Sequence, residues 1–192
     1  MKNILLTLIF VLNLSIGFSQ VKKILIQPLG NVSPSITNLI AKSISDFYGF
    51  KTEILKPVKP TDDLYAPSKT RYSANKILRK FNGPTNKIVI TNFDITTNKG
   101  NNNEWGVFGL GLQPGKICVV STFRLKKNVS NTKFQQRLIK VVLHEVGHNL
   151  GLNHCDNDKK CLMNDAKGTS KQVDNEKVWI CNKCSQKINL KK

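Results

Sequence analysis

The chain has 192 residues, which is enough for one domain with at most a small appendage, and 40% of them are hydrophobic, as in an ordinary globular core. Its 30 lysine and arginine residues outnumber its 12 aspartate and glutamate residues, so the formal net charge is +18. The lysines are spread along the chain without interleaved arginine and aromatic residues, which favours a solvated basic surface and argues against a specific nucleic-acid partner.

The N-terminus has the pattern of a signal peptide. Lys2 precedes an apolar run at residues 4–18, and Gly17 and Ser19 place small residues at the −3 and −1 positions before Gln20. The run is too short for a comfortable membrane span, and an asparagine interrupts it. We therefore expect cleavage after Ser19 and export to the periplasm or secretion, with no stable membrane anchor afterwards; an uncleaved anchor is the alternative.

The part of the chain that follows is predicted to alternate between strands and helices. Short apolar runs bounded by Gly and Pro predict buried strands over residues 23–27, 51–55 and 87–95. Apolar residues at helical spacing predict helices over residues 33–48 and 73–81.

Loops, a hairpin and a long helix are predicted next. Residues 56–71 and 96–103 are polar and are predicted as loops. The segments 105–112 and 117–123 are apolar and flank a Pro-Gly turn, so they predict a β-hairpin. A helix that begins near Ser130 then runs into a histidine-rich segment. This order of elements predicts an α/β or α+β fold with a mixed sheet.

All three histidines of the chain lie in the motif HExxHxxGxxH. On a helix, His144 and His148 are neighbours on one face, so both ring nitrogens reach one Zn²⁺ at about 2.0–2.1 Å. Gly151 can take a positive φ angle and turn the chain, which brings His154 back as a third ligand. Glu145 is rotated off that face and can hold a metal-bound water. Three protein ligands leave the fourth position to water, which is the arrangement of a catalytic zinc.

Chance is a poor explanation of this motif. From average residue frequencies, a bare HExxH arises in about 1 in 200 chains of this length. Requiring the later Gly and His at their positions lowers that frequency roughly a thousandfold. We therefore predict a zinc site rather than a coincidence on a polar helix.

Four cysteines follow, where the apolar periodicity disappears: Cys155, Cys161, Cys181 and Cys184. A segment without a hydrophobic core of its own needs a cross-link to hold its structure together. Zn²⁺ held by four thiolates would supply one and is favoured, because the last two cysteines form a CxxC pair beside another zinc site. Two disulfides are the alternative, which export makes plausible. The fifth cysteine, Cys118, is predicted to be a buried core thiol.

The second half of the chain resembles the archaemetzincins, a branch of the metzincin metallopeptidases. Their signature is HExxHxxGxxHC, a second cysteine followed by x-Met, and a CxxC pair about seventeen residues later. Here these parts stand at residues 144–155, 161–163 and 181–184, with seventeen residues between Met163 and the CxxC pair. Five residues, 156–160, separate the first two cysteines where the family usually has four, a difference that a surface loop absorbs easily.

The resemblance covers about residues 87–184 and implies a metzincin-like fold. A mixed twisted sheet would pack on helices, with an active-site helix and a small zinc-stapled C-terminal subdomain. We therefore expect a peptidase domain over residues 20–192, divided into residues 20–151 and 152–192. Met163 would lie under the catalytic zinc as the Met-turn residue. The predicted signal peptide departs from the family, which is often intracellular.

The predicted function is zinc-dependent hydrolysis of peptide bonds. Zn²⁺ would lower the pKa of its bound water toward about 7. Glu145 would accept the proton as general base and pass it to the leaving amine. We expect two Zn²⁺ per chain, one catalytic and one structural, a peptide or protein substrate, and a monomer. The alternative is a secreted, basic, zinc-stabilised module that binds a polyanion and has little or no peptidase activity.

Overall fold

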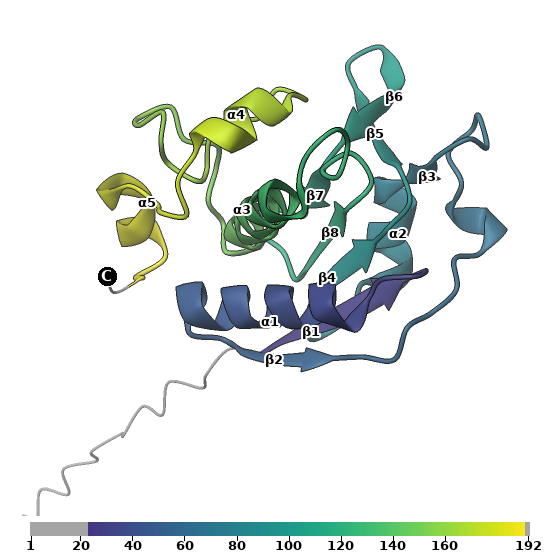
Figure 1. The fold of residues 1–192 in the computed structure, drawn as a ribbon, viewed down its shortest axis with the longest axis horizontal. Coiled ribbons are helices and arrows are strands. Elements are labelled where there is room, and N and C mark those ends of the chain that lie inside the picture. The colour runs from purple at the N-terminus through teal and green to yellow at the C-terminus, as the bar shows by residue number, and fades with distance from the viewer. Residues whose placement is uncertain (1–22, 191–192) are drawn as a thin grey trace, which may run out of the picture.

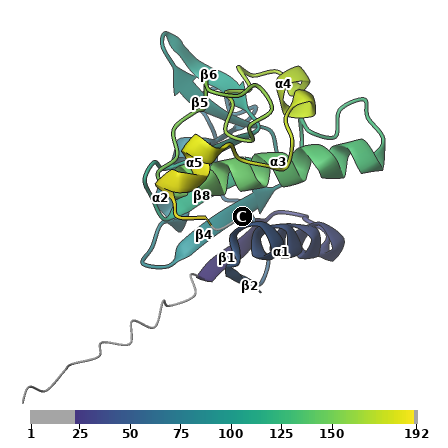
Figure 2. The same ribbon diagram turned by 90° about the vertical axis from the view of Figure 1, so that its left-hand side faces the viewer.

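The fold is known from a computed structural model that describes residues 23–190, so the predicted signal peptide lies outside the described residues. No helix in this range combines the length and the apolar character that a membrane span requires. Figures 1 and 2 show a twisted sheet with a long central helix, α3, which lies between α1 on one side and α4 on the other.

The main sheet has five strands in the spatial order β2-β1-β4-β8-β7. Its strands are β1 (Lys23–Leu29), β2 (Lys51–Ile54), β4 (Asn86–Thr91), β7 (Gly109–Gly111) and β8 (Ile117–Ser121). β2, β1, β4 and β8 pair in parallel, and β7 runs antiparallel to β8 at the edge. The predicted mixed sheet is therefore confirmed.

Helices cover both faces of this sheet, which explains why its central strands are continuous apolar runs. Ile88 and Ile90 on β4 face a core with α1 (Pro34–Tyr48) and α3 (Asn131–Asn149). Val89, between them, points to the other face and packs with Ile77 of α2 (Ala74–Phe81).

The three predicted helices are present, and two of them carry a side-chain N-cap. The Ser130 hydroxyl accepts a hydrogen bond from the backbone N–H of Lys133, and Ser73 caps α2 in the same way. Ser33 stands at the N-cap of α1 without such a bond, and Gly49 ends that helix with a φ of 69°.

Two predictions for the middle of the chain are wrong. Residues 96–103 are largely not a loop, because β5 (Ile95–Lys99) and β6 (Asn102–Val107) form a hairpin that joins β3 (Tyr72–Ser73) in a second sheet. The predicted strand 105–112 is divided at Phe108: its first part belongs to this second sheet, and only β7 pairs with β8. The predicted loop 56–71 also contains a short 3₁₀ helix, Asp62–Leu64.

The segment after Gly151 packs on α3 and shares its core. It carries two short helices, α4 (Ser170–Asn175) and α5 (Asn182–Lys187). Val173 and Ile180 belong to the same apolar cluster as the buried side of α3. Arg137 of α3 donates two hydrogen bonds, of 2.8 and 2.7 Å, to the Asp174 carboxylate, which fixes α4 on this helix.

Candidate metal centre and active-site cleft

Helix α3 and the turn after it bring the three histidines together. The ring centroids of His144 and His148 lie 4.6 Å apart on one face of α3. Gly151 has a φ of 93° and donates its backbone N–H to the His148 carbonyl at 2.8 Å, so the chain turns back at this residue. The His154 ring consequently lies 4.8 Å from that of His148, and one ligand atom from each histidine lies within 4.8 Å of the others. We call these three residues the histidine cluster.

Hydrogen bonds from Nδ1 fix the orientation of the His144 and His148 imidazole rings. His144 donates from Nδ1 to the Leu162 carbonyl at 2.8 Å, and His148 donates from Nδ1 to the Leu152 carbonyl at 2.7 Å. Each bond leaves Nε2 without a proton, which is the form in which an imidazole binds a metal. Burial, followed by the neighbouring His148, lowers the pKa of His144 to about 3, so its ring is neutral at physiological pH. The cluster fits a divalent cation with a preference for nitrogen ligands, as Zn²⁺ has.

Glu145 lies beside the histidine cluster in the same cleft. Its side chain is buried, and burial raises the pKa of its carboxyl group to about 8. The opposite wall is β7, whose glycines allow helix and strand to approach. A Cβ atom at Gly109 would lie 2.6 Å from Oε1 of Glu145, and one at Gly111 would lie 3.0 Å from the Glu145 carbonyl oxygen. These two glycines therefore allow α3 to lie close to β7.

Met163 lies directly behind the active-site helix. A Cβ atom at Gly147 would lie 2.5 Å from Met163 Sδ, so only glycine permits this close packing. Met163 is fully buried, and its carbonyl accepts a hydrogen bond of 2.7 Å from the backbone N–H of Cys155. Met163 thus supports the helix that carries His144 and His148 and contacts the chain next to His154.

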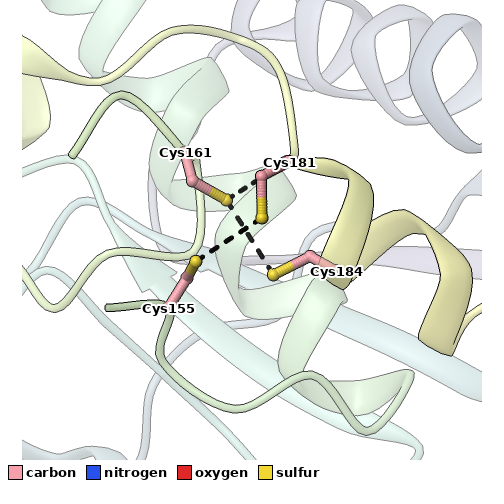
Figure 3. A group of neighbouring side chains, drawn as sticks. All are labelled: Cys155, Cys161, Cys181 and Cys184. Atoms are coloured by element: carbon pink, nitrogen blue, oxygen red, sulfur yellow. Dashed lines mark hydrogen bonds between the residues drawn. The ribbon is translucent and has the colours of Figure 1, made fainter. Parts of the chain in front are cut away.

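The four predicted cysteines form a second group, the cysteine cluster, in which the Sγ atoms converge (Figure 3). The Sγ atoms of Cys155 and Cys181 lie 3.6 Å apart, and those of Cys161 and Cys184 lie 4.0 Å apart. A tetrahedral zinc with Zn–S bonds of about 2.3 Å requires sulfur atoms ~3.8 Å apart. The spacing therefore fits a tetrahedral Zn²⁺. None of the five cysteines of the chain forms a disulfide, and Cys118 is buried in β8.

The two clusters share one short piece of backbone, residues 161–163. It contains Cys161, the Leu162 carbonyl that accepts from His144, and Met163. The backbone N–H of Leu162 donates to the Trp179 carbonyl at 2.8 Å, close to the CxxC pair. The position of His144 therefore depends on the chain that surrounds the cysteine cluster.

The cleft around the histidine cluster has a volume of about 450 Å³. Beyond the predicted site residues its lining includes Trp105, Phe108, Ala166, Val173 and Glu176. We did not predict Trp105 or Glu176 as part of the site, because nothing in their local sequence sets them apart. The tyrosines Tyr48, Tyr65 and Tyr72 are not among the residues that line the cleft.

β7 and β8 lie close enough to the cleft to be compared as binding sites for a substrate backbone. β8 is excluded, since both of its edges are paired, with β4 and with β7. β7 pairs only with β8 and forms the edge of the sheet, and it borders the cleft. An extended peptide can add to an edge of this kind through backbone hydrogen bonds.

Comparisons with known proteins agree with this arrangement. Residues 31–190 match the model of peptidase family M54. The archaemetzincin of Haloarcula marismortui is 32% identical over 174 residues, which cover 85% of this chain and 97% of that protein. The crystal structure of archaemetzincin from Archaeoglobus fulgidus superposes with a TM-score of 0.76 at 30% identity, covering 86% of this chain and 99% of that chain. Archaemetzincin from Methanopyrus kandleri has the same fold, with a TM-score of 0.74 at 24% identity, 91% of this chain and 97% of that chain being covered.

Proposed function

Since this chain belongs to peptidase family M54, the archaemetzincins, and is a zinc metallopeptidase acting on peptides or proteins, we propose that Glu145 is its general base and that the histidine cluster binds the catalytic Zn²⁺. The observation that carries the proposal is the position of the buried Glu145 carboxylate beside three converging imidazoles in one cleft. Family membership also favours a peptidase over the alternative of a binding module without activity.

When bound, Zn²⁺ supplies Lewis acidity, which acidifies water and polarises the scissile carbonyl. The side chains of the protein position and move the proton. Glu145 takes a proton from the attacking water on a carboxylate oxygen and delivers it to the leaving amine. Burial raises the pKa of its carboxyl group, which makes it a stronger base than an exposed glutamate, and a cation bound by the histidine cluster would favour its ionised form. β7 aligns the substrate backbone by strand addition.

The Glu145→Gln variant tests this role, because glutamine keeps the shape of glutamate but cannot carry the proton. We expect turnover to fall by roughly 10²- to 10⁴-fold, with the zinc content of the protein unchanged. The measurements are peptide hydrolysis and metal analysis of the same sample. Wild-type turnover in a variant that retains zinc would exclude Glu145 as the base.

We also propose that the cysteine cluster holds a second, structural Zn²⁺. The Sγ spacing and the absence of disulfides among the five cysteines support this proposal. Burial raises the pKa of Cys161 to about 11, and a bound cation offsets that effect because it stabilises the thiolate. Metal analysis should give about two zinc ions per chain. A single zinc ion, with Cys118 as the only free thiol, would indicate disulfides instead.

Export remains a proposal that rests on the N-terminal sequence. We propose that Ser19 is the last residue removed and that the mature chain begins at Gln20. Mass spectrometry of the protein purified from the exporting cells should give the mass of residues 20–192. A protein that retains Lys2 would indicate an uncleaved anchor or no export.

A further inference from the structure

The cleft is richer in acidic residues, relative to basic ones, than the rest of the molecule. The chain carries 30 lysine and arginine residues against 12 acidic ones. Of the described residues that line the cleft, however, three are acidic, namely Glu145, Asp165 and Glu176, and Lys99 is the sole lysine or arginine. Glu145 already has a role in hydrolysis. The other two make this cleft suited to a cationic substrate.

Glu176 is a buried acidic residue of this cleft that takes no part in the proposed hydrolysis step. Its exposed fraction is 6%, so its carboxylate is largely removed from bulk water. The carboxylate accepts one long hydrogen bond, of 3.3 Å, from the side-chain amide of Gln172. None of the ion pairs found among residues 23–190 includes Glu176.

The neighbouring Lys140 does not form an ion pair with Glu176. The Lys140 ammonium group donates to the carbonyl oxygens of Val173 and Asp174, at 2.8 and 3.3 Å. Burial raises the pKa of Glu176 to about 7, and the influence of Lys140 only partly opposes this shift. Burial of an isolated carboxylate costs desolvation free energy, and a cation that pairs with the carboxylate offsets part of that cost.

The walls next to Glu176 are apolar. Val141 lies one helical turn before Glu145 on α3, and Val173 lies one turn before Glu176 at the end of α4; both line the cleft. A lysine or arginine side chain combines an apolar stem with a terminal cation. Such a side chain would place its stem against the valines and its cation at the Glu176 carboxylate.

We infer that Glu176 is a specificity-determining residue, which selects substrate peptides by accepting the ammonium or guanidinium group of a lysine or arginine side chain close to the cleaved bond. The inference rests on the proposed peptidase function and adds a substrate class to it. Glu176 binds the substrate and takes no part in the proton transfer assigned to Glu145.

The test compares wild type with Glu176→Gln, which keeps the shape of the side chain and removes its charge. Pairs of peptides that differ only in lysine against norleucine at one position are hydrolysed, and a peptide library is profiled by mass spectrometry. We expect wild type to prefer lysine or arginine at one position next to the cleaved bond. In the variant, the kcat/KM ratio of lysine to norleucine should fall roughly 10- to 100-fold, the usual effect of one charge-assisted hydrogen bond.

Two controls separate this effect from others. Asp62→Asn removes the same charge from an exposed residue outside the cleft and should leave the ratio unchanged. The midpoint of thermal unfolding and the zinc content of Glu176→Gln should match those of wild type, which shows that the variant is folded. Glu176→Lys should reverse the preference, toward glutamate or aspartate. Equal lysine-to-norleucine ratios in wild type and Glu176→Gln would overturn the inference.

A binding measurement keeps the inference separate from the proposed function. The Glu145→Gln protein, loaded with zinc, is titrated with the lysine and norleucine peptides, with and without the additional Glu176→Gln substitution. Tighter binding of the lysine peptide that disappears with Glu176→Gln supports the inference even if wild type hydrolyses no peptide, a result that would overturn the peptidase proposal alone. Equal binding of both peptides by the Glu145→Gln protein would overturn the inference.

Discussion

Replacing Gly109 by alanine should displace the proposed general base without touching any proposed metal ligand. Gly109 lies on β7, and its φ angle is not positive, so alanine introduces no backbone strain. The added methyl group would face Glu145 across the gap between strand and helix. Its distances to Oε1, Cγ and Cδ of Glu145 would be 2.6, 2.7 and 2.9 Å.

The size of the effect follows from these distances. Ordinary van der Waals contact begins at about 3.4 Å, so Oε1 must move by about 0.8 Å from its present 2.6 Å separation. Misplacing a reacting group by about 1 Å can cost on the order of 100-fold in rate. We therefore expect kcat/KM to fall roughly 30- to 100-fold, whereas zinc content should stay close to that of wild type.

The assay is peptide hydrolysis, with metal analysis and thermal unfolding on the same preparations. Gly83→Ala is the matched control, because no atom lies within 4 Å of a Cβ atom at Gly83 and its φ is not positive either. A Gly109→Ala variant with kcat/KM within threefold of wild type would refute the reasoning. It would mean either that Glu145 is not the base or that β7 yields without consequence.

Two further predictions concern stability. Gly147→Ala should lower the free energy of unfolding by up to about 2 kcal/mol, because the new methyl group would meet Met163 Sδ at 2.5 Å. Alanine normally stabilises a helix interior by about 1 kcal/mol relative to glycine, so the expected sign is the reverse of the usual one. Denaturant unfolding of this variant and of Gly83→Ala measures the difference, and a more stable Gly147→Ala variant would contradict the prediction. Asp174→Asn should remove the ion pair with Arg137, which holds the pKa of Asp174 at about 2, below the 3.8 of a free aspartate. The ion pair stabilises the folded protein by about 1–2 kcal/mol after allowance for solvent screening. This stabilisation is fully present above pH ~4 and is lost as the pH falls toward 2. The difference in unfolding free energy between wild type and this variant should narrow over that range; a difference that stays constant down to pH 2.5 would contradict the assignment.

Local signals in the sequence were sufficient for the three longest helices and the motif, whereas the short helices α4 and α5 were not predicted. The helical spacing of apolar residues and the cap at Ser130 predicted the start of α3 within a residue, because burial of one face and capping both act over short distances. The histidine cluster followed for the same reason, since a helix and one glycine turn bring its members together. The cysteine cluster was predicted from spacing alone, and the structure places its four sulfur atoms in one group.

Features that depend on contacts between distant segments were not predicted. The β5–β6 hairpin is polar and lies outside the main sheet, so Thr97 and Lys99 have no apolar alternation that would indicate a strand. The division at Phe108 comes from a change of sheet, which local sequence does not record. Glu176 reaches the cleft only because α4 packs on α3, partly through Arg137 and Asp174.

The backbone at residues 161–163 makes completion of the active site depend on the order in which the chain is synthesised. A chain synthesised from its N-terminus contains the histidine helix before it contains the CxxC pair. The 40 positions from His144 to Cys184 take about 2–8 s to add at ordinary elongation rates. Until then the Leu162 carbonyl, which orients His144, lacks its own anchor near Trp179. A nascent chain that already carries HExxH therefore still lacks the backbone that orients His144.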